Sequence, residues 1–365
     1  MKESKGPAHE PFMRRALELA REGWGQTAPN PMVGAVVVRD DQIVGEGFHA
    51  KYGGEHAEVA ALRKAGAQAR GATLYVTLEP CRHHGKTPPC TDAIFASGIA
   101  RVVYAIGDPS PVAGGGAAEL QSAMIDVVSG VLRTEARELN APFFHSISGA
   151  LPWTTLKLAV SMEMAIANQG GSTTWLTSEE SRAEVHRMRA GHDAVAVGVG
   201  TILADDPQLN VRDAPKPRKP PARVVFDRSL RTPQQSKVVF TARDVPTIVL
   251  TSDAAPADKS AALRDAGVHV LTAPDLREGF RRLRSAGIRS LLVEGGATIA
   301  NAVVDDGLAH RLVVFQAPVS LGAGALHAFE GAGSGLLGRL ELLRMLERRS
   351  VGPDTMTTYV LQEWT

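Results

Sequence analysis

Residues 77–90 read TLEPCRHHGKTPPC, and this stretch holds both cysteines of the chain, Cys81 and Cys90. A little upstream, residues 56–58 read HAE and add His56 and Glu58. Two cysteines so close together form either a small disulfide loop or two ligands of one metal ion. We interpret them as metal ligands, because the N-terminus lacks the apolar stretch of a secretory signal and cytosolic thiols stay reduced.

His56, Cys81 and Cys90 offer one imidazole and two thiolates, which are ligand types that zinc prefers. Three protein ligands leave one position for water, whose pKa the metal lowers from about 16 towards about 7. Glu58 is then free to carry protons between that water and a leaving amine, as in the H-x-E and Pro-Cys pattern of zinc deaminases. A structural zinc or unpaired core thiols are the alternatives, and the combined pattern favours one catalytic zinc per chain.

Composition places these motifs in a globular protein of two domains. The chain has 365 residues, of which 44% are hydrophobic and 22% charged, so sizeable cores can form. The formal net charge of +1 offers no general attraction to nucleic acid or to an anionic membrane. With no apolar run of about 18 residues, we expect a cytoplasmic protein with small-molecule substrates and without a membrane or nucleic-acid partner.

Hydrophobic periodicity predicts an α/β fold in both halves. The prolines of residues 140–152 suggest an irregular junction near Ser148, so we expect domains at 1–147 and 148–365. Thr177 and Glu180 form a possible capping box at the start of a helix. We expect an amphipathic first helix that ends at Gly23, followed by helices at Ala57–Ala67 and Thr91–Ala96. The expected strands are Val33–Val38, Ile43–His49, Thr73–Leu78, Arg101–Ala105, Trp153–Val160, Ala194–Val199, Arg223–Phe226, Thr247–Leu250 and Ser290–Glu294.

Two glycine-rich stretches follow expected strands in the second half. Gly295 and Gly296 precede an apolar helix, so a phosphate could approach the exposed NH groups at its N-terminus. Residues 198–201, GVGT, form a second such crossover. A tight turn explains either stretch equally well, and neither is the complete G-x-G-x-x-G fingerprint of a dinucleotide-binding Rossmann fold.

The first half resembles the deaminase domain of the bifunctional riboflavin-biosynthesis deaminase/reductase family, RibD. The resemblance rests on TAPNPMVG at residues 27–34, GFH at 47–49, HAE at 56–58 and the stretch 77–90. It implies a cytidine-deaminase-like three-layer α/β/α domain. The implied substrate is 2,5-diamino-6-(5-phosphoribosylamino)pyrimidin-4(3H)-one. The implied base and phosphate contacts are Asn30, His49, His83 and Lys86.

The second half resembles the reductase domain of the same family in LKLA at 156–159, WLTS at 175–178, RMRA at 187–190, ADDP at 204–207 and LVEGG at 292–296. The resemblance implies a dihydrofolate-reductase-like α/β fold that binds NADPH and reduces the ribosyl group to ribityl. The implied cofactor contacts are Ala159, Trp175, Thr201, Asp205, Gly296, Ala297, Thr298, Ile299, Ala300, Asn301 and Ala302. The implied substrate contacts are Lys157, Thr173, Arg189, Leu209, Arg212 and Glu294.

Two stretches depart from the family pattern. Residues 161–167 read SMEMAIA, whereas the family pattern at this place is S-L-D-G-[KR]-[IT]-A. Met164 therefore replaces a glycine. Residues 108–114, DPSPVAG, have Ser110 in place of an asparagine and are one residue short. The leading hypothesis is a bifunctional enzyme that forms a homo-oligomer, dimer or tetramer. The alternatives are a deaminase with an impaired reductase domain, a nucleic-acid deaminase with an appended domain, and a non-catalytic zinc-binding scaffold.

Overall fold

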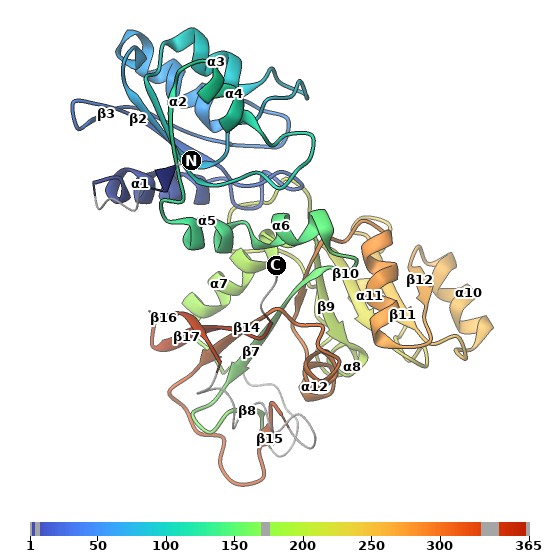
Figure 1. Cartoon of the computed structure of the whole chain (residues 1–365). Coiled ribbons are helices and arrows are strands. Elements are labelled where there is room, and N and C mark those ends of the chain that lie inside the picture. Colours follow the sequence, from blue (N-terminus) through green and yellow to red (C-terminus); the bar gives the residue numbers. More distant parts are fainter. Residues whose placement is uncertain (1, 4–7, 169–175, 330–342, 363–365) are drawn as a thin grey trace. The chain divides into compact units, whose positions relative to one another are not determined.

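The computed structural model describes residues 2–3, 8–168, 176–329 and 343–362. By its internal contacts the chain divides into two units, Met1–Ser148 and Gly149–Thr365, each with its own sheet (Figure 1). Within the described ranges, no helix combines the length and the apolar character that crossing a bilayer requires.

The first unit is built on a six-stranded sheet with the order β1-β6-β5-β4-β2-β3. Strands β1, β6, β5 and β4 run parallel, and the hairpin β2–β3 joins β4 in the antiparallel direction. Asp40 and Asp41 take positive φ angles of 50° and 57° in the hairpin turn, which short polar side chains tolerate. The strands are β1 (Lys2–Glu3), β2 (Gly34–Arg39), β3 (Gln42–Phe48), β4 (Thr73–Leu78), β5 (Arg101–Ile106) and β6 (Asp126–Ser129).

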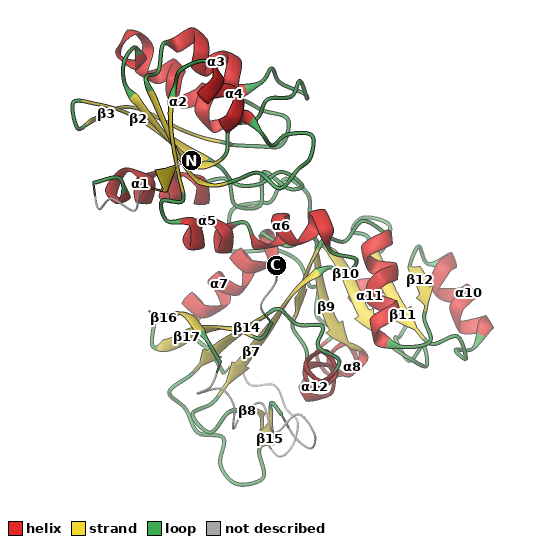
Figure 2. Cartoon of the chain, in the orientation of Figure 1, coloured by secondary structure: helices red, strands yellow, loops and turns green. Residues whose placement is uncertain are grey.

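Successive side chains of a strand point to opposite faces of the sheet, and both faces of this sheet are apolar. Helices therefore cover both faces. Met13 and Leu17 of α1 and Ala136 of α5 pack against one face. Helices α2, α3 and α4 cover the other face, with Ile94 and Leu120 fully buried. The predicted three-layer α/β/α domain is confirmed (Figure 2). The helices are α1 (Glu10–Arg21), α2 (Ala57–Ala65), the short 3-10 helix η1 (Gly66–Ala69), α3 (Cys90–Ser97), α4 (Gly116–Ser122), α5 (Arg133–Leu139) and α6 (Ala141–Ser148).

The second unit has a nine-stranded sheet with the order β12-β11-β10-β9-β13-β7-β14-β17-β16. All strands from β12 to β14 in this order run parallel, whereas β17 is antiparallel to β14 and β16 is antiparallel to β17. A separate pair joins β8 (Ala165–Ala167) to β15 (Leu326–His327). The main strands are β7 (Trp153–Val160), β9 (Ala194–Gly198), β10 (Ala222–Phe226), β11 (Thr247–Thr251), β12 (His269–Thr272), β13 (Ser290–Val293), β14 (Arg311–Gln316), β16 (Met345–Val351) and β17 (Asp354–Val360).

Helices again lie on both faces of this sheet. Phe280 of α11 and Val303 of α12 are fully buried on one face. Met188 of α7, Ile202 of α8 and Leu263 of α10 are buried on the other. The helices are α7 (Glu179–Ala190), α8 (Val199–Asp205), α9 (Lys237–Phe240), α10 (Ala257–Asp265), α11 (Leu276–Ser285) and α12 (Ala297–Asp305).

Two local predictions were wrong. The cap of α7 is Ser178, whose hydroxyl accepts a hydrogen bond from the Ser181 amide, so the predicted Thr177–Glu180 box is off by one residue. The junction that we expected to be irregular contains α6. Pro142 is compatible with that helix because it occupies the first turn, where no amide donor is needed.

Candidate active sites

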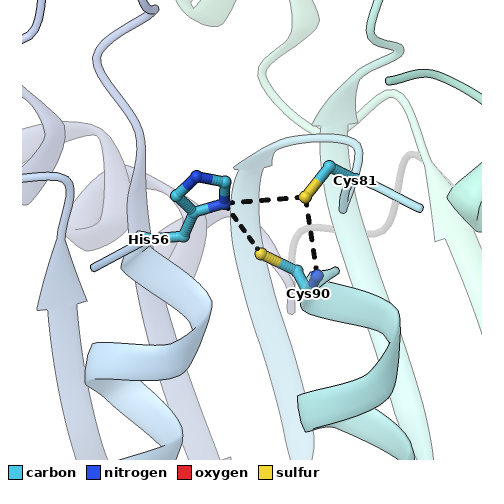
Figure 3. Close-up of side chains that lie close together, drawn as sticks. All are labelled: His56, Cys81 and Cys90. Atoms are coloured by element: carbon cyan, nitrogen blue, oxygen red, sulfur yellow. Dashed lines mark hydrogen bonds between the residues drawn. The ribbon is translucent and has the colours of Figure 1, made fainter. Parts of the chain in front are cut away.

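The first site forms where α2 and α3 begin beside the end of β4. His56 is the residue that precedes α2, Cys81 follows β4, and Cys90 is the first residue of α3. The Nδ1 atom of His56 lies 3.1 Å from Cys90 Sγ and 3.5 Å from Cys81 Sγ (Figure 3). The three potential ligand atoms all lie within 4.8 Å of one another. The structure therefore brings the predicted metal ligands together.

The chemistry of this cluster fits zinc. Thr87 Oγ1 lies 3.1 Å from His56 Nε2, so a proton on Nε2 leaves the Nδ1 lone pair directed at the two sulfurs. The hydrogen bond with Cys90 and the neighbouring His56 lower the pKa of the Cys81 thiol well below its usual range. A thiolate is the form in which cysteine binds a metal. The Cys90 pKa is raised, first by that same hydrogen bond and then by burial.

Glu58 lies beside the ligands on α2. Its side chain is buried, with an exposed fraction of 4%, and burial raises the pKa of its carboxyl. The residue lines the same cavity as His56 and Cys81. A buried carboxyl group with a raised pKa next to a metal site is suited to accept and return protons.

A cavity of about 320 Å³ opens in front of this cluster. Its lining includes all four predicted deaminase substrate contacts, namely Asn30, His49, His83 and Lys86. The buried His49 ring has Nδ1 3.0 Å from the Glu55 carbonyl, which can only accept, so Nε2 is left as an acceptor. Neither His49 Nε2 nor His83 Nδ1 has a partner within the described part of the chain. Both atoms are available to a ligand.

Several residues of this site did not stand out in the sequence. Thr87, Tyr52 and Asp108 also line the cavity, although no spacing rule pointed to them. The Glu79 carboxylate accepts hydrogen bonds from the amides of Asp108, Gly115 and Ala117 and thereby holds the loop after β5. Glu79 belongs to the sequence motif of residues 77–90. Its hydrogen bonds to the loop after β5 could not be predicted from that motif, because they form only in the folded chain.

The shortened loop after β5 closes on itself through Ser110. The Ser110 hydroxyl accepts hydrogen bonds from the amides of Val112 and Ala113, and its own amide donates to Asp108 Oδ1. Ser110 lines the cavity. Serine is suited to such local turns, so this departure from the family pattern has a compact local structure.

The second site is a cavity of about 2080 Å³ in the second unit. Glu294 follows β13, and Lys157 lies on the neighbouring parallel strand β7. Arg189 of α7 donates from Nε to Glu294 Oε1 at 2.6 Å and from Nη2 to Oε2 at 2.9 Å. Lys157 Nζ lies 3.4 Å from Glu294 Oε2. All three residues line the cavity.

Charge balance explains the ionisation of this cluster. Burial alone raises the pKa of the Glu294 carboxyl, but the charges and hydrogen bonds of Arg189 and Lys157 outweigh burial and lower it to about 2. Glu294 is therefore charged at neutral pH. It keeps two cations at the cavity wall, beside the other predicted substrate contacts Leu209 and Arg212.

His186 is a further residue of this site that sequence reasoning missed. Its Nδ1 lies 3.1 Å from both the Asn210 carbonyl oxygen and the Arg212 amide nitrogen. Arg189 Nη1 also donates to the Asn210 carbonyl, at 2.9 Å. Helix α7 thus fixes the backbone of the segment that carries Leu209 and Arg212.

The start of α12 fits the phosphates of a nucleotide. Gly296 precedes the helix, no side chain caps its first NH groups, and a Cβ at Gly296 would meet nothing within 4 Å. Gly295 is needed for packing, since a Cβ there would lie 1.8 Å from Ile299 Cγ2. The predicted cofactor contacts that line the cavity are Ala159, Thr201, Asp205, Gly296, Ala297, Thr298, Ile299, Asn301 and Ala302.

One predicted contact among the described residues does not line this cavity. Ala300 is not among its lining residues, because its side chain is fully buried in the hydrophobic core. Trp175 and Thr173 lie outside the described residues.

The turn after β7 keeps the backbone angle that a glycine would favour. Met164 has a φ of 63°, and the Glu163 carboxylate accepts hydrogen bonds from the Ser320 hydroxyl at 3.0 Å and the Gly322 amide at 3.1 Å. The adjoining Ile166 lines the large cavity. The substituted turn therefore forms, with a methionine in a conformation that L-residues rarely adopt.

Two family models match the chain. The cytidine and deoxycytidylate deaminase zinc-binding region covers residues 7–106, and the RibD C-terminal domain covers residues 152–356. The first match contains the zinc cluster and the second contains the large cavity. Together they define the chain as a deaminase joined to a reductase.

Named relatives agree over nearly the whole length. The riboflavin biosynthesis protein RibD of Aquifex aeolicus is 46% identical over 316 residues, which are 86% of this chain and 88% of the relative. RibD of Escherichia coli is 40% identical over 94% of this chain and 97% of the relative. The structure of Acinetobacter baumannii RibD has a TM-score of 0.82 at 36% identity and covers 97% of this chain and 98% of that one.

A Thermotoga maritima structure described as a diaminohydroxyphosphoribosylaminopyrimidine deaminase/5-amino-6-(5-phosphoribosylamino)uracil reductase has a TM-score of 0.80 at 36% identity, with 97% and 98% of the two chains covered. The chain belongs to the RibD family. It is a bifunctional riboflavin-biosynthesis enzyme with a zinc-binding deaminase domain and an NADPH-dependent reductase domain.

Proposed function

We propose that the first site deaminates 2,5-diamino-6-(5-phosphoribosylamino)pyrimidin-4(3H)-one and that the second reduces the ribosyl group of the product to ribityl. The observation that carries the proposal is the convergence of His56, Cys81 and Cys90 beside the buried Glu58, at the edge of a cavity. The substrate named for the Thermotoga maritima relative supports the same reaction class.

In the deaminase domain, His56, Cys81 and Cys90 would hold a zinc ion. When bound, zinc supplies a water that is nucleophilic at neutral pH. Glu58 would accept a proton at its carboxylate and return it to the leaving ammonia, because its carboxyl is buried beside the ligands and its pKa is raised by that burial.

The remaining deaminase contacts bind and orient the substrate. His49 Nε2 accepts a hydrogen bond from the pyrimidine, and Asn30 and His83, which line the same cavity, also contact it. Lys86 lies in the loop between the two cysteines and lines the same cavity. It provides a charge for the 5′-phosphate.

In the reductase domain, NADPH supplies a hydride when it is bound. The NH groups at the start of α12 bind its phosphates. The ion pair with Glu294, at 3.4 Å, orients Lys157, so that its ammonium donates a hydrogen bond to the ribosyl group. Arg212, whose amide is fixed by His186, binds the substrate phosphate through its guanidinium fork.

The deaminase role is assigned to residues 1–147 and the reductase role to 148–365, which the division of the chain after Ser148 supports. We also propose a cytoplasmic homo-oligomer, dimer or tetramer, without a nucleic-acid partner. The net charge of +1 supports the absence of a nucleic-acid partner. Size-exclusion chromatography with light scattering tests the oligomeric state, and a salt-titrated RNA-binding assay tests the absence of nucleic-acid binding.

The test of both activities is to supply the pyrimidine phosphate and to follow ammonia release and NADPH oxidation separately. Glu58→Gln should keep its zinc but lose about 10²-fold or more in deamination rate. The variant should still oxidise NADPH when the deaminated intermediate is supplied directly. Loss of zinc from Glu58→Gln, or full deaminase activity, would contradict the role of Glu58.

A further inference from the structure

The side chain of Lys86 lies against the turn that contains Tyr52 and Gly53. Lys86 Nζ lies 4.1 Å from the centroid of the Tyr52 ring. Gly53 has a φ of 77°, and a Cβ at that position would lie 3.3 Å from Lys86 Cδ. Tyr52, Gly53 and Lys86 all line the smaller cavity. The glycine thus makes room for the stem of the lysine, and the aromatic ring holds its ammonium.

This contact orders a charge without neutralising it. Lys86 is exposed, and a lysine side chain free in solvent samples many rotamers, whose loss opposes ligand binding. An aromatic face attracts the ammonium through its quadrupole but carries no net charge. Among the described residues Lys86 forms no ion pair, and the carboxylate of the neighbouring Glu55 is paired with Arg63 at 3.1 Å. The ammonium is therefore held in place and still available to an anion.

We propose that Tyr52 is a positioning residue of the deaminase site, which holds the Lys86 ammonium over the cavity so that it is already ordered when the phosphate of the substrate arrives. The proposal rests on the proposed function, in which Lys86 binds the 5′-phosphate. It adds that Tyr52 sets the position of the Lys86 ammonium. In this role Tyr52 acts through Lys86.

The first experiment compares Tyr52→Leu with Tyr52→Phe in steady-state ammonia release by the full-length zinc-loaded enzyme. Tyr52→Leu removes the aromatic face and should raise KM for the pyrimidine phosphate about two- to fivefold, with kcat unchanged. Tyr52→Phe keeps the face and should have the wild-type KM. Zinc content should equal that of the wild type in both variants. An unchanged or lowered KM in Tyr52→Leu, or a KM for Tyr52→Phe raised as much as for Tyr52→Leu, would overturn the proposal.

The second experiment asks whether Tyr52 acts through Lys86. Lys86→Gln should raise KM, and adding Tyr52→Leu to Lys86→Gln should raise it no further, because no ammonium is left to position. Independent, multiplying effects of the two changes would overturn the proposal, although the phosphate contact would stand. An unchanged KM in Lys86→Gln would remove both the proposed phosphate contact and the role of Tyr52.

Discussion

Thr87 Oγ1 lies 3.1 Å from His56 Nε2, on the side of the imidazole opposite the two sulfurs. The hydroxyl thereby orients the ring, and it can accept a hydrogen bond from Nε2 when Nδ1 carries the lone pair that a metal needs. Thr87 belongs to the loop between Cys81 and Cys90, so the eight residues that separate the two cysteines supply an outer contact as well as lining the cavity. The length of this loop therefore has a structural consequence at the metal site.

Removal of this outer contact should weaken zinc binding. We expect Thr87→Val, which keeps the shape of the side chain but loses the hydroxyl, to reduce zinc affinity about 10-fold or more. Thr87→Ser is the matched control, since it retains the hydroxyl and should bind zinc nearly as tightly as the wild type. Competition with a chromophoric chelator measures both affinities. Equal affinity of the Val and Ser variants would show that the hydroxyl does not matter.

The direct ligands should have a larger effect. Cys81→Ser removes one of the two thiolates, and we expect the purified variant to lack stoichiometric zinc. Metal analysis of the purified protein is the measurement. Stoichiometric zinc in Cys81→Ser would rule out this ligand assignment.

The cluster of candidate metal ligands could be predicted because its signal is local in the sequence. His56, Cys81 and Cys90 are recognisable by residue type and spacing alone, and the short elements that carry them form in the expected order. Thr87 and Tyr52 could not be predicted in the same way. Their roles arise only when the loop between the cysteines folds back over His56 and the turn at Gly53, and no periodic pattern encodes that closure.

The reductase half shows the same limit. Strand β7 was predicted with its observed bounds, although its sequence WTTLKLAV is not a continuous apolar run, and most of its residues are buried. The cap of α7 was missed by one residue, since Thr177 and Ser178 are both good caps and only the folded chain selects Ser178. Ala300 belongs to α12, whose neighbouring residues line the cavity, but the helical period turns its methyl group into the core.

Each activity should be removable without the other. Lys157→Met removes one of the two cations paired with Glu294 at the reductase cavity but leaves Glu294 paired with Arg189, so the domain should still fold. We expect NADPH oxidation to fall about 10²-fold or more when the intermediate is supplied, with ammonia release unchanged. Parallel assays of the same preparation measure both rates. A matching loss of ammonia release would contradict the assignment of the activities to separate domains.

The ion pair of Glu294 should make stability depend on pH. The pKa of this carboxyl is about 2 in the folded chain, below the ordinary value of 4.5. Because the pKa is lower in the folded state, the carboxyl stabilises the folded state at pH values above its unfolded-state pKa. That contribution is lost as the pH falls from about 5 to about 2. For a buried group the loss is on the order of 3 kcal/mol.

Urea unfolding at pH 6 and at pH 3.5 tests this expectation. Wild-type protein should lose more stability between the two pH values than Glu294→Gln, which has no carboxyl to titrate. Glu347→Gln is a suitable control because the Glu347 side chain is half exposed, at 53%. An equal loss of stability in wild type and Glu294→Gln would refute the assignment of this pH dependence to Glu294.

The turn at Met164 gives the last prediction. Met164 has a φ of 63°, a backbone conformation that costs a residue with a Cβ about 1 kcal/mol relative to glycine. Its side chain also packs against the core, so a substitution changes both the backbone strain and the side-chain packing. Restoring the complete family turn is not feasible, because Ala165 is fully buried and an arginine at that position would have no room.

Comparison of Met164→Gly with Met164→Ala separates the two terms. Both variants lose the side-chain packing, but only glycine loses the backbone strain. We therefore expect Met164→Gly to be more stable than Met164→Ala by about 1 kcal/mol, which corresponds to about 2–4 °C in Tm for a unit of this size. Calorimetry of the full-length chain measures the difference, and NADPH oxidation by the same two variants shows whether relief of the strain raises reductase activity. A Met164→Ala variant as stable as Met164→Gly would mean that the left-handed backbone at this turn carries no strain.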